Sequence, residues 1–291
     1  MTEGIITKGI GGFYYVATHS GVYECRARGI FRKKKITPTV GDRVSIKVLD
    51  EENKKGSLEV IHERKSCLIR PRVANVDRAV IVFAAVSPDI NFDLLDRFIA
   101  LAEEQSLEVV ICINKIDLDA DEKYKYAADI YRKAGYEVIC ISAKNNINID
   151  ALKAVLRDGI SVFAGPSGVG KSSLINSLNP DFNMETGEIS EKIERGRHTT
   201  RHAQLFELKE GGFIVDSPGF SSIFIEHIDK DDLKYYFREF TPYNDTCYYN
   251  GCSHTHEPDC EVKARIGGEI SKERYDRYVS LYKELAEERK K

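Results

Sequence analysis

The sequence has 291 residues, of which 42% are hydrophobic and 31% charged, and its formal net charge is -3. This length fits roughly two or three domains, and the composition is that of a folded chain rather than a disordered one. The small net charge excludes a uniformly polybasic nucleic-acid binder, and the longest apolar run, Ala79–Val86, is too short to cross a bilayer.

Residues 1–68 are predicted to form a first domain of short β-strands. The strand-like segments are 4–9, 12–18, 22–28, 42–48 and 57–62. Alternation of apolar and polar residues, clear in Val44–Val48, is typical of strands with one buried face. Because no strong helical pattern lies among them, we expect a small β-barrel, and the pattern leaves an OB-like and an SH3-like barrel open.

Basic residues are concentrated in this first domain. Residues 1–66 carry 13 Lys and Arg against 8 Asp and Glu, and the excess is greatest in Arg26–Lys35. A run of this kind is typical of a solvated loop. It is also the kind of surface that contacts the phosphates of RNA.

Residues 69–222 alternate between strand-like and helix-like segments. The predicted strands are 80–86, 108–113, 137–141 and 160–164, and each is followed by a predicted helix, at 92–105, 121–134, 149–156 and 171–178. After a polar segment come two further strand-like pieces, 204–208 and 212–216. Alternating strands and helices predict a parallel sheet with helices on both faces.

A phosphate-binding loop is predicted between the strand at 160–164 and the helix at 171–178. It fits G-x-x-x-x-G-K-[ST], and its residues are Gly165, Pro166, Ser167, Gly168, Val169, Gly170, Lys171, Ser172 and the adjoining Ser173. Glycines let backbone N–H groups converge on phosphate oxygens, and the start of a helix adds a favourable dipole. Lys171 is expected to contact the β- and γ-phosphates, and the Ser172 hydroxyl to bind Mg²⁺.

Two motifs indicate that the base is guanine. Asn114-Lys115-Ile116-Asp117 follows the strand at 108–113 and fits N-K-x-D. The Asp117 carboxylate is suited to accept hydrogen bonds from N1 and N2 of guanine, which adenine does not offer. Asn114 would brace the loop, and the stem of Lys115 would cover the base. The S-A-K motif, in which the alanine N–H would meet guanine O6, is made by Ser142, Ala143 and Lys144.

A fourth motif completes a GTPase set whose order is unusual. Asp216-Ser217-Pro218-Gly219 fits D-x-x-G, in which Asp216 would hold Mg²⁺ through water and the Gly219 N–H would meet the γ-phosphate. In ordinary small GTPases the phosphate loop precedes the guanine motifs, whereas here it follows them. A circular permutation of the same sheet explains this order.

Residues 223–291 are predicted to form a metal-binding domain. Three of the 7 cysteines lie near a histidine in Cys247-x4-Cys252-x-His254-x5-Cys260, which is the Cys₃His set of a structural zinc site, with His256 as a rival ligand. Clustered cysteines of this kind suit a reducing compartment, and residues 1–10 lack a signal-peptide pattern, so we expect a cytoplasmic protein. Tyr and Leu at helical spacing within 271–291 predict a helix with a packed face.

Together these features resemble the RsgA (YjeQ/YloQ) family of ribosome biogenesis GTPases. The resemblance is carried by Gly165–Ser173, by the NKID, SAK and DSPG segments, by Gly196–His202 and by the Cys/His cluster. It implies an OB barrel, a circularly permuted GTPase and a zinc domain, and it favours His254 over His256. It also implies a monomer with slow GTP hydrolysis that is stimulated by the small ribosomal subunit. The implied role is late maturation of that subunit, with contact to its rRNA and release of an assembly factor.

The residues that would position the attacking water depart from the common pattern. Many GTPases carry a Gln directly after D-x-x-G, but here that residue is Phe220. The resemblance assigns catalysis to His198 in the segment 195–200, and Thr200, rather than Thr199, would contact Mg²⁺ and the γ-phosphate. A surface imidazole and an RNA contact are the alternative interpretations of His198.

Two other functions fit some of the same motifs. A P-loop kinase of a small molecule would share the phosphate loop, although the guanine motifs argue against it. An RNA-binding module with a structural nucleotide would rely on the barrel and the zinc domain alone. Competition by ATP would favour the kinase, and turnover that rises with ribosomal subunits would exclude the binding module.

Overall fold

The computed structural model describes residues 1–68, 72–179, 203–216 and 228–288. The chain divides into two compact units. The first holds Met1–Arg78, Leu152–Phe163 and Ile175–Phe220, and the second holds Ala79–Ala151, Ala164–Leu174 and Ser221–Lys291. The domain boundaries expected from the sequence, 1–68, 69–222 and 223–291, stay predictions.

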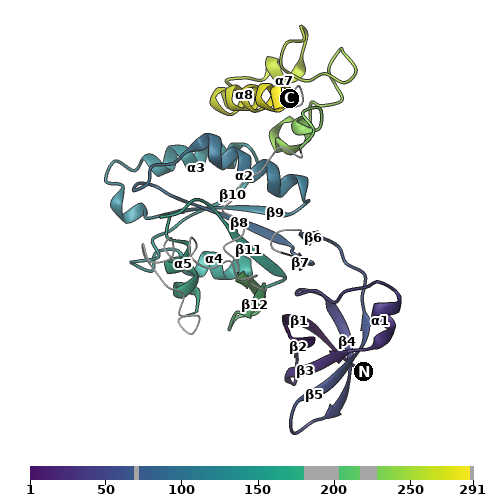
Figure 1. Ribbon diagram of the computed structural model, residues 1–291. Coiled ribbons are helices and arrows are strands. Elements are labelled where there is room, and N and C mark those ends of the chain that lie inside the picture. Colours follow the sequence, from purple (N-terminus) through teal and green to yellow (C-terminus); the bar gives the residue numbers. More distant parts are fainter. Residues whose placement is uncertain (69–71, 180–202, 217–227, 289–291) are drawn as a thin grey trace. The chain divides into compact units, whose positions relative to one another are not determined.

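The N-terminal strands form a closed barrel (Figure 1). They are β1 (Thr2–Ile10), β2 (Phe13–Thr18), β3 (Gly21–Ala27), β4 (Arg43–Asp50) and β5 (Lys55–Ile61). Their order is β1-β2-β3-β5-β4, and β4 also pairs with β1, which closes the sheet. β3 and β5 run parallel, and the other neighbours are antiparallel. This is the connectivity of an OB barrel, so the strand predictions are confirmed and the SH3-like alternative is excluded.

The barrel core explains the alternating pattern of its strands. Residues on the inward faces are fully buried: Ile6, Val16, Tyr23, Cys25, Val44, Ile46 and Leu58. At one end the buried Asp42 carboxylate accepts hydrogen bonds from Arg64 Nε at 2.6 Å and from the Thr39 N–H at 2.7 Å. This contact fixes the chain where it leaves the barrel, because a buried carboxylate is stable only with such partners.

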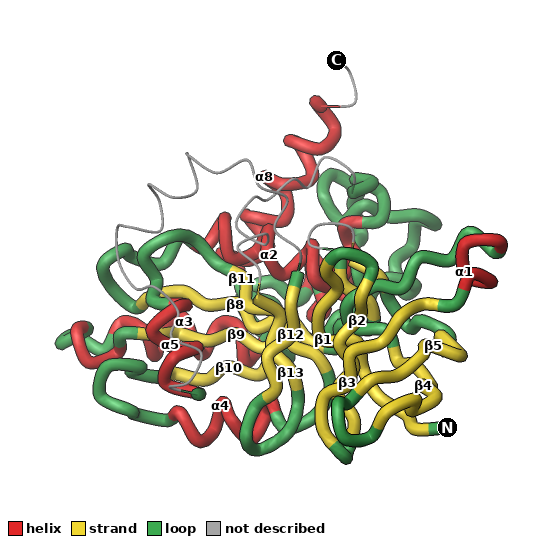
Figure 2. Tube along the Cα trace, turned by 60° about the horizontal axis from the view of Figure 1, so that its bottom comes forward, coloured by secondary structure: helices red, strands yellow, loops and turns green. Residues whose placement is uncertain are grey.

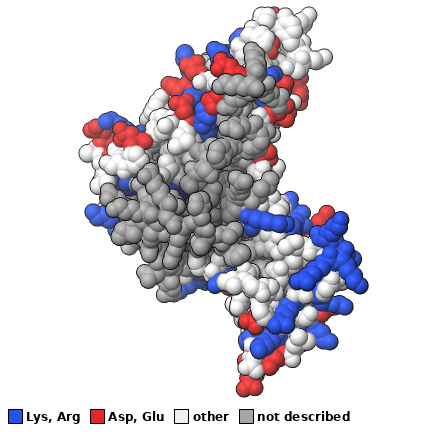
Figure 3. Space-filling model, in the orientation of Figure 1, with Lys and Arg blue, Asp and Glu red and all other residues white. Residues whose placement is uncertain are grey.

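The basic run forms a short helix where the sequence predicted a loop. α1 (Gly29–Lys33) is anchored by the buried side chain of Phe31. Figure 3 shows Lys and Arg gathered over this part of the barrel. The single apolar anchor explains the difference, since it holds the run against the barrel while its charges stay in solvent. The exposed basic residues are Arg26, Arg28, Arg32, Lys33, Lys34 and Lys35.

The remaining strands of the first unit agree only in part with the predicted parallel sheet. β11 (Ile160–Ala164) and β13 (Phe213–Asp216) are parallel, but β12 (Gln204–Glu207) runs antiparallel to β13. A tight turn causes this, because the Leu208 N–H donates to the Gly212 carbonyl at 3.0 Å and the chain reverses without a crossover helix. The sequence also did not predict the two-residue strands β6 (Cys67–Leu68) and β7 (Val73–Ala74).

The second unit contains strands of its own. β8 (Arg78–Ala84), β9 (Glu108–Asn114) and β10 (Glu137–Cys140) lie in the order β10-β9-β8, as Figure 2 shows. β9 and β10 are parallel, and α2 (Phe92–Glu104) and α3 (Lys123–Lys133) lie together on one face of these strands (Figure 1). α4 (Ile149–Leu156) and α5 (Lys171–Leu178) have the predicted positions. β8 and β9 are buried over nearly their whole length, and this burial accounts for their continuous apolar sequences.

The C-terminal part is a small helical domain with an aromatic core. Its elements are η4 (Leu233–Tyr236), η5 (Arg238–Phe240), α7 (Glu261–Ala264) and α8 (Lys272–Glu288). The Phe237 and Phe240 rings meet the Tyr278 ring edge-on, with centroids 5.0 and 4.9 Å apart. α8 confirms the predicted helix, and its tyrosines pack into this core. None of the helices in the described ranges is long and apolar enough to span a membrane.

A buried ion network joins α8 to α2 within the second unit. The Asp96 carboxylate on α2 accepts hydrogen bonds from the guanidinium groups of Arg274 and Arg277 and, at 2.8 Å, from the Tyr131 hydroxyl on α3. Arg274 also pairs with Glu239 of η5. Asp96 and Arg274 are only 3% and 1% exposed, so these charges depend on one another rather than on water.

Candidate nucleotide and metal sites

The phosphate loop connects β11 with α5. Lys171 Nζ donates to the carbonyl oxygens of Gly165 at 2.8 Å and Pro166 at 2.7 Å, so the loop curls around this ammonium group. The Gly170 carbonyl accepts from the Leu174 N–H at 2.9 Å, which begins the helix. The loop thus places a cation beside the N-terminus of α5, the arrangement that binds phosphate in such motifs.

Two positions of the phosphate loop must be glycine, because other atoms of the chain lie too close for a side chain. At Gly165, where φ is +138°, a Cβ atom would lie 2.1 Å from the Val82 carbonyl oxygen. At Gly170, where φ is +92°, it would lie 2.5 Å from Asn114 Nδ2. Both positions therefore exclude side chains, and the second does so because the phosphate loop lies against the guanine motif.

Asn114 links the three predicted motifs. Its side chain is buried; Nδ2 donates to the Val169 carbonyl at 2.9 Å, and Oδ1 accepts from the Ala143 N–H at 3.1 Å. These partners lie 55 and 29 positions away along the chain. One amide group therefore brings the N-K-x-D, phosphate and S-A-K segments together.

The other residues of N-K-x-D occupy a tight turn. Lys115 adopts a left-handed backbone with φ of 62°, and its Nζ donates to the carbonyl oxygens of Gly168, at 2.7 Å, and Ser87. Asp117 is exposed in the turn that follows. The buried Asp119 carboxylate accepts from the Tyr124 N–H, in the first turn of α3, at 2.8 Å. The Asp117 carboxylate thus stands in solvent between two anchored residues.

The S-A-K segment lies beside Asn114. Ser142 is fully buried, and its Oγ accepts from the Asn145 N–H at 3.2 Å. Lys144 is exposed. The Ala143 N–H, predicted to meet guanine O6, donates to Asn114 Oδ1 in this structure, so this backbone group also holds the site together.

Several predicted residues lie outside the described part of the chain. These are His198, Thr199, Thr200, Gly219 and Phe220. Asp216 is described, and it ends β13 opposite Gln204 of β12. Ser172 and Ser173 lie in the first turn of α5.

The predicted metal ligands lie together in the C-terminal domain. One ligand atom from each of Cys247, Cys252, His254 and Cys260 lies within 4.8 Å of the others. Cys260 Sγ is 3.3 Å from His254 Nδ1 and 3.9 Å from Cys247 Sγ. A tetrahedral zinc site with ordinary bond lengths separates its ligand atoms by roughly 3.5–3.8 Å, so the donor set and its spacing fit this ion.

The surroundings of the cluster favour metal binding by His254. Burial, and then the positive charge of Lys234, lower the pKa of His254 to about 4, which keeps the imidazole neutral at pH 7. Burial raises the pKa of the Cys252 thiol to about 12, so a thiolate there requires a cation beside it. The rival His256 has a side chain that is 81% exposed, outside the cluster.

Residues that the sequence did not connect with the metal site hold the ligand loop. The Tyr275 hydroxyl donates to the His254 carbonyl at 2.8 Å, and Lys234 Nζ donates to the Cys252 carbonyl at 3.0 Å. The Glu261 N–H points at Cys247 Sγ at 3.3 Å, and Asn244 Oδ1 lies 2.9 Å from His254 Nε2. No motif marks these residues, because their role depends on contacts made across the fold.

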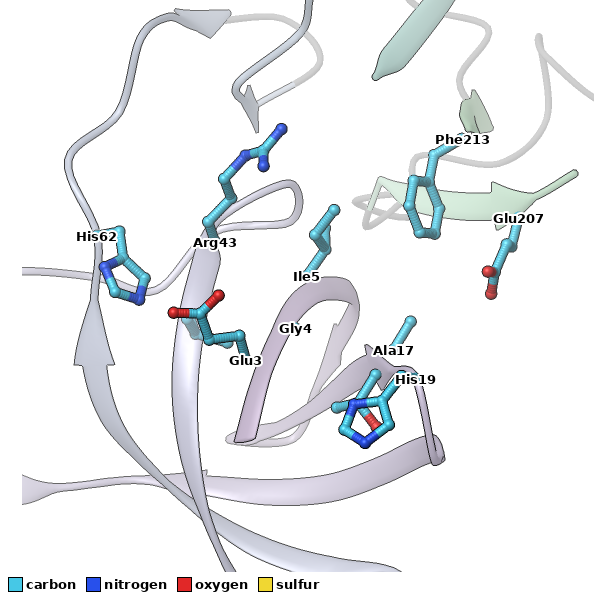
Figure 4. Close-up of a pocket in the computed structure, with 11 residues that line it drawn as sticks. Glu3, Gly4, Ile5, Ala17, His19, Arg43, His62, Glu207 and Phe213 are labelled. Carbon is cyan, nitrogen blue, oxygen red and sulfur yellow. The ribbon is translucent and has the colours of Figure 1, made fainter. Parts of the chain in front are cut away.

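A separate cavity of about 440 Å³ lies in the first unit. Figure 4 shows Glu3 and Arg43 of the barrel on one side and Glu207 and Phe213 of β12 and β13 on another. Its lining carries both signs of charge and contains no residue of the guanine, phosphate or metal motifs. The cavity is therefore distinct from the sites described above.

Comparison with known proteins agrees with this arrangement. Two family profiles match, the RsgA N-terminal domain over residues 3–58 and the RsgA GTPase over residues 61–226. The small ribosomal subunit biogenesis GTPase RsgA of Clostridium perfringens (strain ATCC 13124) is 51% identical over 288 residues, 99% of both chains. The protein of the same name from Alkaliphilus metalliredigens is 47% identical over 291 residues, 100% of both chains.

Two crystal structures are similar over nearly the whole length. YjeQ from Thermotoga maritima is 37% identical, with a TM-score of 0.85 over 98% of both chains. YloQ, described as a circularly permuted GTPase, is 40% identical, with a TM-score of 0.83 over 99% of this chain and 96% of YloQ. With its guanine motifs ahead of the phosphate loop, the chain belongs to the RsgA family of circularly permuted GTPases.

Proposed function

We infer that this protein binds and hydrolyses GTP and, through contact with the small ribosomal subunit, assists the late maturation of that subunit. The observation that carries this inference is the pair of hydrogen bonds by which Asn114 joins the guanine, phosphate and S-A-K segments. Segments joined in this way can bind a guanine base and its phosphates at once. The relatives named as small ribosomal subunit biogenesis GTPases support the subunit as the partner.

The nucleotide contacts follow from the motifs. Asp117 would accept from guanine N1 and N2, while Lys171 and the loop N–H groups bind the phosphates. Mg²⁺, which neutralises charge on the phosphate oxygens, would be held by Ser172, Thr200 and Asp216. The full nucleotide set is Asn114, Lys115, Asp117, Ser142, Ala143, Lys144, Gly165, Pro166, Ser167, Gly168, Val169, Gly170, Lys171, Ser172, Ser173, Asp216 and Gly219.

Hydrolysis would not use the Gln that commonly follows D-x-x-G, so another residue must position the attacking water. Phe220 has no group that can orient water, so His198 takes this role in the proposal. Slow turnover by the protein alone follows. A partner that places His198 and Thr200 against the nucleotide would raise the rate, as partners do in other GTPases.

The remaining parts of the molecule would bind the partner and stabilise the fold. The exposed basic side chains around α1 would contact rRNA phosphates (Figure 3). The Cys₃His cluster would hold a structural Zn²⁺, because four protein ligands leave no position for a reacting water. We expect a cytoplasmic monomer that also influences the release of an assembly factor.

The decisive measurement is steady-state GTP hydrolysis with no subunits, with small subunits and with large subunits. Strong stimulation by small subunits alone supports the proposal. Tight GTP binding without stimulation would support a GTP-binding protein but would rule out the small subunit as its activator. ATP that competes equally with GTP would favour a small-molecule kinase, and GTP binding without turnover would favour an RNA-binding module.

The catalytic role of His198 has its own test. We expect His198→Ala to lower subunit-stimulated hydrolysis by about 10²-fold or more while leaving the GTP dissociation constant within about threefold of wild type. Single-turnover rates and equilibrium binding of a fluorescent GTP analogue separate the two quantities. Equal loss of binding and turnover would assign His198 a structural or RNA-contact role.

A further inference from the structure

The two ring nitrogens of His254 face different surroundings. Nδ1 points into the sulfur cluster, 3.3 Å from Cys260 Sγ and 3.6 Å from Cys247 Sγ. Nε2 points away from it and lies 2.9 Å from Asn244 Oδ1. Both His254 and Asn244 are buried, so water does not compete for this contact.

This arrangement decides which nitrogen can bind a metal. A neutral imidazole carries one N–H, and an amide oxygen only accepts hydrogen bonds. The proton therefore lies on Nε2, where it donates to Asn244, and the lone pair of Nδ1 faces the thiols. We propose that Asn244 is a positioning residue of the zinc site that fixes Nδ1 of His254 as the ligand, an inference that rests on the proposed binding of zinc.

Other contacts hold the same ring in one orientation. The Phe240 ring meets the imidazole edge-on with centroids 5.9 Å apart, and the Tyr275 hydroxyl holds the His254 carbonyl at 2.8 Å. The backbone at His254 is left-handed, with φ of 58°. With the backbone and the ring face held, the Asn244 contact fixes the rotation that directs Nδ1 at the cluster. Such outer partners of a ligating histidine orient the ring and raise its basicity.

Charge balance supports a thiolate-rich site at this position. Zn²⁺ with three thiolates and a neutral imidazole carries one net negative charge. The Lys234 ammonium is buried, and it donates to the Cys252 carbonyl at 3.0 Å, next to the cluster. It supplies the compensating charge without offering a lone pair that would compete for the metal.

The first test uses the unmodified full-length chain. Zinc content is measured, and the His254 ring is then examined by long-range ¹H–¹⁵N NMR of zinc-loaded, ¹⁵N-labelled protein. We expect one zinc per chain, a metal-bound Nδ1 and a protonated Nε2. Zinc bound through Nε2 would overturn the assignment but keep the zinc site, whereas absence of stoichiometric zinc would overturn both.

The second test compares three variants by competition for zinc with a chelating dye. Asn244→Leu removes the acceptor, and we expect zinc affinity to fall about 10- to 100-fold. Asn244→Asp keeps an acceptor and should retain affinity within about threefold. Asn250→Leu is the matched control, since Asn250 is exposed in the same loop, and it should behave as wild type. Wild-type affinity in Asn244→Leu, or equal losses in the Leu and Asp variants, would contradict the proposal.

Discussion

Asn114 contributes more than the local bracing that its motif predicts. Its buried amide satisfies a buried carbonyl of the phosphate loop and a partly buried N–H of the S-A-K segment. Gly170 must lack a side chain because this amide lies so close. The segments predicted to bind the base and the phosphates are therefore held by one buried group, although the two ligand moieties differ in chemistry.

We predict that Asn114→Ala weakens GTP binding by about 10²-fold. The variant leaves the Val169 carbonyl and the Ala143 N–H without their partner, and each such loss is worth about 1–3 kcal/mol. Isothermal titration calorimetry with a non-hydrolysable GTP analogue measures the change. Asn145→Ala, which alters an exposed amide in the adjacent loop, is the control and should bind as wild type. Equal affinities for both variants would show that the three segments do not depend on Asn114.

At the scale of secondary-structure elements, α2 and α8 are joined within the second unit by a buried ion network. Asp96, Arg274, Arg277 and Glu239 come from three elements and meet where water is excluded. Tyr131 extends the network to α3, and burial together with the Asp96 charge raises its pKa well above the usual value. α8 thus depends for its position on charged groups as well as on its aromatic face.

We predict that Arg274→Met lowers the free energy of unfolding by about 3–5 kcal/mol. The buried Glu239 carboxylate would lose its partner, and an uncompensated buried charge is strongly destabilising. Equilibrium urea unfolding measures this quantity. Lys272→Met on the same helix breaks only an exposed ion pair with Asp276 and should cost less than about 1 kcal/mol. If the free energies of unfolding of the two variants differ by less than about 1 kcal/mol, the network does not stabilise the fold.

At the scale of the whole molecule, the metal cluster and the guanine motifs belong to one compact unit, while the barrel belongs to the other. The cluster sits in a core of aromatic and aliphatic residues that continues onto Ala100 of α2. Loss of the metal should therefore loosen the C-terminal domain first. The barrel strands close on themselves and have their own core, so they should not respond.

We predict that removal of the metal with a chelator increases hydrogen exchange in residues 243–262 and in the first turns of α8, while exchange in residues 1–61 stays unchanged. The physical reason is that metal binding and folding are coupled in small clusters of this kind. Hydrogen–deuterium exchange with mass spectrometry gives both values in one experiment. Re-addition of zinc should restore protection, and Cys67→Ser, which alters an exposed cysteine outside the cluster, should respond as wild type does. Uniform exchange changes, or none, would contradict the prediction.

The sequence by itself determined the longer strands, the longer helices, the four nucleotide motifs and the metal-ligand candidates. These depend on periodicity and on short spacings, which act between near neighbours. Only the tertiary structure decided that Phe31 anchors a helix in the basic run and that β12 turns back on β13. It alone brought Asp96 to Arg274 across 178 positions and Asn244 to His254 Nε2. Such contacts have no signature in the sequence, because they depend on where the folded backbone places distant residues.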